Sequence, residues 1–163
     1  MIALAIILIT EYVWTRRPFD SHRYFLYNGN RQIGICKGDK IMSKTYEFIK
    51  ECGYFYVLTI NGDYPAGRPF GAVMENNNKL YISTNNGNQA HKQLRENENI
   101  QILAKKEGTR EWLRITGKAT ECVDVNMKQK MLDKCPILSK HFSAADDEKY
   151  LLFQVEVLDA EFH

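Results

Sequence analysis

The sequence of 163 residues lacks the marks of several large protein classes. It contains no GxGxxG motif and no P-loop, so neither common nucleotide-binding motif is present. Its N-terminal apolar run, Met1–Ile9, is shorter than the ~20 residues that cross a bilayer, and no basic segment precedes it as in a secretory signal. No two of its four cysteines form a CxxC pair, and no histidine stands at a zinc-ligand spacing from them. We therefore expect reduced thiols in a cytoplasmic protein, no membrane span and no metal site. The cysteines are Cys36, Cys52, Cys122 and Cys135.

The sequence also lacks a large excess of charge of either sign, since its net charge is only +2. Residues 1–41 contain six Lys/Arg against three acidic residues, which leaves 16 Lys/Arg and 17 Asp/Glu for the rest of the chain. A nucleic-acid-binding protein needs a basic face, so this balance speaks against a nucleic-acid partner. Hydrophobic residues make up 44% and charged residues 26%, which is ordinary for a soluble domain that buries a full core.

Residues 1–41 are predicted to be an N-terminal extension outside the core domain, because they sustain no hydrophobic period of 2 or 3.6. A patterned helix then begins at Met42, with Ser43 as its N-cap and Gly53 as its end. We expect the native domain to cover 42–163. The alternative is that the extension tethers the protein to a membrane. Mass spectrometry that finds the extension on the mature protein in its native cell would contradict the first interpretation.

Six segments rich in aromatic and β-branched residues are predicted β-strands. Asn61-Gly62 is a strong hairpin signal after the first of them, and Pro65 and Pro69 delay the second because proline donates no ladder hydrogen bond. The short links exclude a parallel sheet, and an open antiparallel sheet would leave exposed edges. The predicted fold is mainly β with flanking helices, a six-stranded antiparallel split β-barrel. The strands are 54–60, 68–75, 79–84, 100–105, 111–121 and 150–157, with helices at 88–97 and 124–134.

The segment from Thr84 to Lys92 is a candidate anion site. A helix that starts here directs its free backbone N–H groups at its own N-terminus, and Lys92 lies one turn further on. Arg68, at the start of a neighbouring strand, could add a bidentate guanidinium. Spacing alone leaves a second interpretation open and favours it, namely a plain strand-to-helix connector with a solvated lysine. The further donors in the segment are Thr84, Asn85, Asn88 and Gln89.

Four motifs then follow one another with characteristic gaps: GRPF at 67–70, KLYISTN at 79–85, KQLREN at 92–97 and EWLRITGKA at 111–119. Their order resembles the FMN-binding split-barrel family, the pyridoxamine 5′-phosphate oxidase-like proteins. This family includes small general-stress and nitroimidazole-reductase-like members. The resemblance covers the chain from Met42 to its C-terminus.

The resemblance implies a homodimer with two FMN sites at its interface. The RPF strand would line the isoalloxazine ring, the segment from Thr84 to Lys92 would hold the ribityl phosphate, and Trp112 would approach the flavin from the partner subunit. The residues assigned to the cofactor in this way are Arg68, Pro69, Phe70, Gly71, Thr84, Asn85, Asn86, Gln89, Lys92 and Trp112.

Two departures from the family pattern affect the expected function. Many members carry Lys or Arg where this chain has Gln89. Lys92 and Arg68 would therefore have to neutralise more of the phosphate charge. The chain also lacks the C-terminal segment with Trp and Arg that grips substrate in a true pyridoxamine 5′-phosphate oxidase, so we do not expect that activity. His91 is interpreted as a surface or interface imidazole, with a second phosphate donor as the alternative.

No catalytic acid or base can be assigned from the sequence. The expected function is a flavin-dependent oxidoreductase that passes electrons from NADH or NADPH to a small acceptor. One alternative is a non-catalytic flavin-binding or stress protein. Another is a split barrel that binds haem or a different planar ligand.

Overall fold

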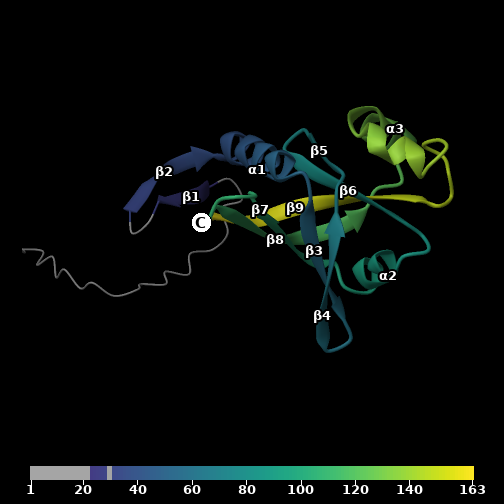
Figure 1. The fold of residues 1–163 in the computed structure, drawn as a ribbon, viewed down its shortest axis with the longest axis horizontal. Coiled ribbons are helices and arrows are strands. Elements are labelled where there is room, and N and C mark those ends of the chain that lie inside the picture. Colours follow the sequence, from purple (N-terminus) through teal and green to yellow (C-terminus); the bar gives the residue numbers. More distant parts are fainter. Residues whose placement is uncertain (1–22, 29–30) are drawn as a thin grey trace, which may run out of the picture.

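The protein is built around one antiparallel sheet of seven strands, shown in Figure 1. The computed structural model describes the backbone of residues 23–28 and 31–163 and the side chains of residues 42–163. The strands of the sheet are β3 (Phe55–Asn61), β4 (Tyr64–Phe70), β5 (Val73–Asn76), β6 (Lys79–Asn85), β7 (Asn99–Lys105), β8 (Trp112–Glu121) and β9 (Tyr150–Phe162). They lie in the order β4-β3-β7-β8-β9-β6-β5. The helices are α1 (Gly38–Cys52), α2 (Gln89–Glu96), α3 (Val125–Lys134) and the short 3-10 helix η1 (Pro136–Lys140).

The sheet curls until its two edge strands meet at one corner. β4 and β5 are the edges, yet only Gly71 and Ala72 separate them along the chain. The three peptide steps from Phe70 to Val73 span at most about 11 Å. The two edge strands therefore lie close together at this corner. Among the described residues, β4 and β5 are not paired with each other by backbone hydrogen bonds. This arrangement is a split barrel, which confirms the predicted fold class.

The strand count differs from the prediction, because the predicted strand 68–75 is in fact two strands, β4 and β5. The chain leaves β4 at Gly71 before β5 begins. β4 also starts earlier than expected and contains both Pro65 and Pro69. Proline is tolerated on an edge strand, whose outer N–H positions need no partner. Because the edge position of β4 is a tertiary property, the local sequence did not predict it.

Two hydrophobic cores lie on opposite faces of β5, β6 and β9. Leu80 and Ile82 of β6 face the first core, inside the barrel, together with side chains of α1 such as Ile49. Tyr81, between them in the sequence, faces the second core, which α3 and η1 cover. This alternation is the period of a β-strand. The second core contains Ala72, Met74, Tyr81, Met131, Leu138, Phe142, Tyr150 and Leu152.

The predicted turns are confirmed, whereas the start of α1 is not. Gly53 ends α1 with a φ of 74°, and Gly62 follows β3 with a φ of 59°, backbone conformations that glycine adopts without strain. Asn77 and Asn78 turn the chain between β5 and β6 with φ values of 52° and 59°. α1 begins at Gly38 rather than at the predicted Met42.

The N-terminal region contains regular structure that the sequence did not predict. The strands β1 (Arg23–Asn28) and β2 (Arg31–Lys37) pair with each other in a separate two-stranded sheet. The apolar run Met1–Ile9 lies outside the described residues. That residues 1–41 are an extension of the core domain stays a prediction. Among the described helices, none is both long enough and apolar enough to cross a membrane.

Candidate functional site

A cavity of about 300 Å³ opens where the barrel is split. One of its walls is made by the end of β4 and the β4–β5 link, Pro69 to Ala72, by the end of β6, Ser83 to Asn85, and by Asn88, the residue before α2. We call this the strand wall. The other wall comes from η1 and the two residues after it, and we call it the η1 wall. It consists of Ile137, Leu138, His141 and Phe142.

Half of the sequence-predicted site residues lie together on the strand wall. They are Pro69, Phe70, Gly71, Thr84 and Asn85. Their side chains and backbone come from β4, the β4–β5 link and β6, which adjoin only because the sheet curls. Asn88, one of the predicted further donors, also lines the cavity. The structure thus brings the two predicted parts of the site, the RPF strand and the strand-to-helix connector, to one place.

Arg68 lies beside the cavity-lining residues but does not line the cavity itself. Its guanidinium donates to Thr59 Oγ1 at 2.9 Å and to Gln93 Oε1 at 2.6 Å. Thr59 also donates to Gln93 Oε1, at 2.6 Å, and both partners are buried. Partial burial lowers the pKa of Arg68, but a guanidinium remains charged at neutral pH. In this arrangement Arg68 joins β4 to β3 and α2.

Three other predicted residues, Asn86, Gln89 and Lys92, do not line the cavity. Asn86 donates through its backbone N–H to the carbonyl of Lys149 at 3.0 Å and through Nδ2 to that of Glu148 at 3.1 Å. It therefore ties the connector to the loop before β9. Gln89 and Lys92 are exposed on α2. Lys92 lies one helical turn after Asn88, so both residues belong to the same side of the helix.

Trp112 lies far from the cavity of its own chain. It begins β8, whose other end, Glu121, is next to Phe153 of β9 and thus near the cavity end of the sheet. Nine residue steps along a strand span about 30 Å. The indole is stacked on the ring of His163, with 4.0 Å between centroids and 6° between planes. Trp112 therefore does not contribute to the cavity of its own chain.

The η1 wall was missed by sequence reasoning. Leu138 and Phe142 are four residues apart and buried in the second core, where Phe142 packs on Tyr150 at 4.6 Å. Ile137 remains 49% exposed. His141, to which the sequence analysis gave no role, is exposed and lines the cavity. The four-residue spacing of Leu138 and Phe142 was the available signal, but it does not reveal which strand the pair packs on. Ala72 and Ser83 of the strand wall were missed as well.

The cavity is polar on one side and nearly neutral throughout. His141 is the one ionisable side chain among its lining residues, all of which are described. Thr84 Oγ1 accepts from Asn88 Nδ2 at 3.3 Å, which leaves the Thr84 hydroxyl proton free to donate to a ligand. Asn85 Oδ1 accepts from the N–H of Gly87 at 2.9 Å. Within the described residues, no group of His, Cys, Asp and Glu could hold a metal ion.

A planar heteroaromatic ring fits this donor set. Hydroxyl and amide groups on the strand wall can meet ring nitrogen and oxygen atoms, and the apolar η1 wall can cover a ring face. A dianionic phosphate does not fit the neutral interior, but the N-terminus of α2 adjoins the cavity at Asn88, and Lys92 lies exposed one helical turn further on. The volume is at the low end of the ~300–1,000 Å³ usual for ligand pockets, so a larger ligand would extend out of the cavity.

The sheet and the cavity at its split define a split β-barrel with a ligand site between its edges. The family model for pyridoxamine 5′-phosphate oxidase matches residues 41–163, and the chain belongs to this family. The resemblance stated from the sequence is thereby confirmed.

Solved structures agree with this assignment. A NimC/NimA family protein from Clostridium acetobutylicum is 35% identical, with 70% of this chain and 78% of that chain covered and a TM-score of 0.66. General Stress Protein 26 from Bacillus anthracis shares the fold at 16% identity, with 75% and 92% covered and a TM-score of 0.62. An FAD-binding protein from Mesorhizobium loti does so at 15% identity, with 72% and 88% covered and a TM-score of 0.55. No curated protein matches the chain.

Proposed function

We propose that the protein binds FMN in the cavity at the barrel split and works as a flavin-dependent oxidoreductase. NADH or NADPH would supply the electrons, and a small molecule would accept them. The observation that carries the proposal is the meeting of the two predicted cofactor segments on the strand wall of one cavity. Family membership supports it, as does the fold shared with a protein described as FAD-binding.

Different parts of the site would hold different parts of FMN. The backbone from Phe70 to Ala72 and the hydroxyl of Thr84 would meet the ring system, since they line the neutral cavity. The phosphate would lie at the margin, near the N-terminus of α2 and the side chain of Lys92. Arg68 would contribute mainly by holding β4 in place, because Thr59 and Gln93 occupy its guanidinium.

The β3–β4 hairpin supports a homodimer. Tyr56 and Ile60 are 47% and 40% exposed on its outer face, with Pro69 and Pro65 opposite them in register. In Figure 1 this hairpin projects from the rest of the sheet. An exposed apolar face of this kind is typical of an interaction surface. We propose that a second copy covers it and brings its Trp112 to the cavity.

A bound flavin would supply the redox chemistry, while the chain supplies position, water exclusion and hydrogen-bond donors. No carboxylate lines the cavity, whose lining residues are all described. His141 is the one ionisable side chain among these lining residues, so this composition suits transfer to and from the flavin with at most one protein acid or base. The free thiols of Cys52, Cys122 and Cys135 suit a cytoplasmic location.

Purified protein tests the proposal directly. We expect a yellow protein that releases FMN on denaturation, identified by mass spectrometry, and a dimer in native mass spectrometry. Oxidation of NADH or NADPH with a quinone or nitroaromatic acceptor would establish turnover. Flavin binding without turnover would favour the non-catalytic alternative. Colourless protein that cannot be reconstituted with FMN would contradict the proposal, and a haem spectrum would replace it with the haem alternative.

A further inference from the structure

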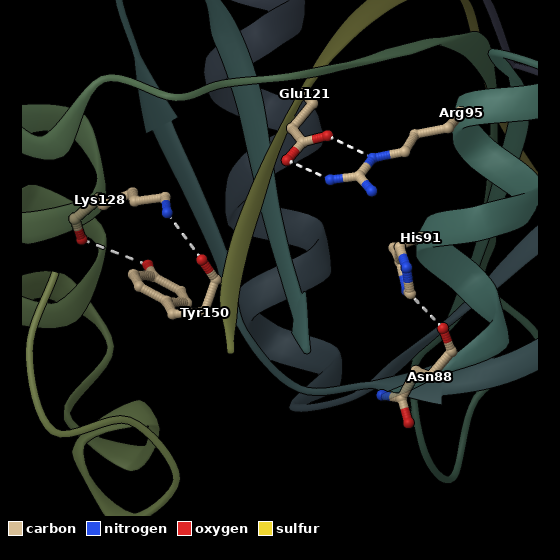
Figure 2. Close-up of polar contacts among 6 residues, drawn as sticks. All are labelled: Asn88, His91, Arg95, Glu121, Lys128 and Tyr150. Atoms are coloured by element: carbon tan, nitrogen blue, oxygen red, sulfur yellow. Dashed lines mark hydrogen bonds and ion pairs between the residues drawn. The ribbon is translucent and has the colours of Figure 1, made fainter. Parts of the chain in front are cut away.

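His91 is buried, although its sequence position suggested a surface or interface imidazole. It lies in the first turn of α2 with 5% of its surface exposed. Its Nδ1 stands 2.6 Å from the carbonyl oxygen of Asn88, as Figure 2 shows. A carbonyl oxygen only accepts hydrogen bonds, so Nδ1 must carry the proton in this contact. The imidazole is therefore held in one orientation by the residue that precedes its own helix.

Asn88 connects this contact to the cavity. It is the N-cap residue of α2, but its side chain does not cap the helix. Instead Nδ2 donates to Thr84 Oγ1 at 3.3 Å, and both residues line the cavity. The backbone N–H of Asn88 donates to the carbonyl of Asn85 at 3.2 Å. Because the peptide group is planar, fixing the Asn88 carbonyl also fixes the direction of the next N–H, that of Gln89.

A separate contact holds α2 on the barrel. Arg95 donates to the two carboxylate oxygens of Glu121 at 2.7 and 2.9 Å. His91 and Arg95 project from the same side of α2 in Figure 2, as residues four apart do. The hydrogen bond from Arg95 lowers the pKa of Glu121, and His91 adds a smaller contribution in the same direction. Arg95 thus fixes the helix on β8, whereas His91 fixes Asn88 on the helix.

We propose that His91 is a positioning residue of the cofactor site, which holds the Asn88 carbonyl so that the Asn88 side chain and Thr84 keep their places in the cavity. The inference rests on the proposed flavin site and adds a residue that does not touch the ligand. Its imidazole would act only through Nδ1, because that atom alone meets Asn88. The role requires a donor at the place of Nδ1 rather than an imidazole as such.

Substitutions at His91 separate this role from a general structural one. Asn places an amide near the position of Nδ1, whereas Gln places it further out and Leu has no donor. We expect His91→Leu and His91→Gln to weaken FMN binding about tenfold, which corresponds to the loss of one hydrogen bond. His91→Asn should restore most of the affinity. Fluorescence titration of the apo-protein with FMN measures the dissociation constant, and thermal unfolding of each apo variant measures its stability.

Arg95→Gln is the matched control, because it releases the α2–β8 contact and leaves the Asn88 carbonyl bonded. It should lower the unfolding temperature without changing FMN affinity. Equal affinity of the Leu variant and wild type would overturn the inference, and so would equal losses in the Asn and Leu variants. If the Leu variant does not fold, Gln against Asn gives the same comparison.

Nitrogen-15 NMR of the wild-type imidazole gives a readout independent of any variant. We expect a protonated Nδ1 in the apo-protein, and a proton on Nε2 alone would overturn the inference. If wild-type protein binds no FMN, the proposed function fails and the inference with it. Wild-type binding with unchanged His91 variants would remove the inference alone.

Discussion

The two walls of the cavity differ in what holds them. The strand wall belongs to the sheet, since β4 pairs with β3 and β6 pairs with β5 and β9. The η1 wall belongs to no ladder. Its residues Leu138 and Phe142 pack into the second core, and the neighbouring α3 is fastened to β9 by Lys128, whose Nζ donates to the Tyr150 carbonyl at 2.7 Å. Figure 2 shows this contact and the return bond from the Tyr150 hydroxyl to the Lys128 carbonyl, at 3.2 Å.

This difference gives the two walls separate roles in the proposed FMN binding. Ladder hydrogen bonds hold the strands of the strand wall, so it can present donors at set positions. The η1 wall is held mainly by packing in the second core, so it sets the width of the cavity and the cover over a ligand. Substitutions that disrupt the second core should therefore weaken binding while the barrel stays folded. Substitutions that disrupt the first core should unfold the barrel, and binding is then lost with the fold.

The largest expected effect tests that division with a pair of phenylalanines. Phe55 is 1% exposed in the first core, and Phe142 is 7% exposed in the second. Either change to Ala should cost about 3–5 kcal/mol of unfolding free energy. Among molecules that remain folded, Phe142→Ala should bind FMN more weakly, because the η1 wall loses its anchor on Tyr150. Phe55→Ala should weaken binding less, because Phe55 reaches the cavity only through its ring contact with Phe70, at 6.0 Å between centroids.

Urea unfolding and FMN titration below the unfolding transition make the measurement. Phe142→Leu, which keeps most of the volume, serves as the milder variant. Wild-type affinity in folded Phe142→Ala protein would show that the η1 wall does not depend on the second core.

The next largest effect compares the stability cost of Gly→Ala at two glycines, one in β8 and one in the β4–β5 link. A Cβ on Gly117 of β8 would collide with the backbone oxygen of Glu156, whereas one on Gly71 would meet nothing within 4 Å. Gly117→Ala should therefore cost about 1–3 kcal/mol through forced backbone movement. Gly71→Ala should change stability by about 0.5 kcal/mol or less. Thermal unfolding compares the two.

Gly71→Ala also sharpens the ligand proposal. If the ring lies along the backbone of the β4–β5 link, the added methyl group should weaken FMN binding in a protein of nearly unchanged stability. Unchanged affinity would place the ring elsewhere in the cavity.

The parts of the fold that local rules determine were predictable from the sequence. The predicted strand 111–121 matches β8 closely, and Asn61-Gly62 marked the first hairpin. Asp124 caps α3 by accepting from the N–H of Asn126 at 2.9 Å, close to the predicted helix start. Such features depend on residues that are close together in the chain, so the local sequence is enough to predict them.

The unpredicted parts depend on partners far along the chain. The guanidinium of Arg68 meets Gln93, 25 residues away, and no spacing rule anticipates that contact. The η1 wall faces the strand wall only because α3 packs on the far face of β6 and β9. The strand half of the site was thus predictable, since family-like motifs mark it, whereas the η1 half required the tertiary structure.

A smaller effect is expected from charge at the margin of the cavity. Lys92→Ala should weaken FMN binding about twofold to fivefold, the usual range for an exposed ion pair, and added salt should shrink the difference. Lys130→Ala, on the exposed side of α3, is the matched control and should bind as wild type does. Fluorescence titration at low and high salt makes the comparison. Equal affinities of both variants and wild type would remove Lys92 from the phosphate site.

The smallest effect concerns the Arg95–Glu121 contact, which fastens α2 to β8. The hydrogen bond from Arg95 lowers the pKa of Glu121 in the folded protein. A lowered carboxyl pKa means that the unfolded state binds more protons at acid pH, so this contribution to stability is present above the unfolded pKa and is lost as pH falls through the folded one. Glu121→Gln lacks the contribution at every pH. The unfolding temperatures of wild type and variant should therefore differ near neutral pH and converge in acid.

The difference should be small, because the Arg95 side chain is 52% exposed and solvent screens the pair. Thermal unfolding of both proteins from neutral to about pH 3 measures it. A constant gap across this range would mean that packing of the Glu121 side chain, rather than its charge, fixes α2. The η1 wall has no ion pair of its own among the described residues. Acid should thus loosen α2 and leave the η1 wall in place, whereas substitutions in the second core should loosen the η1 wall.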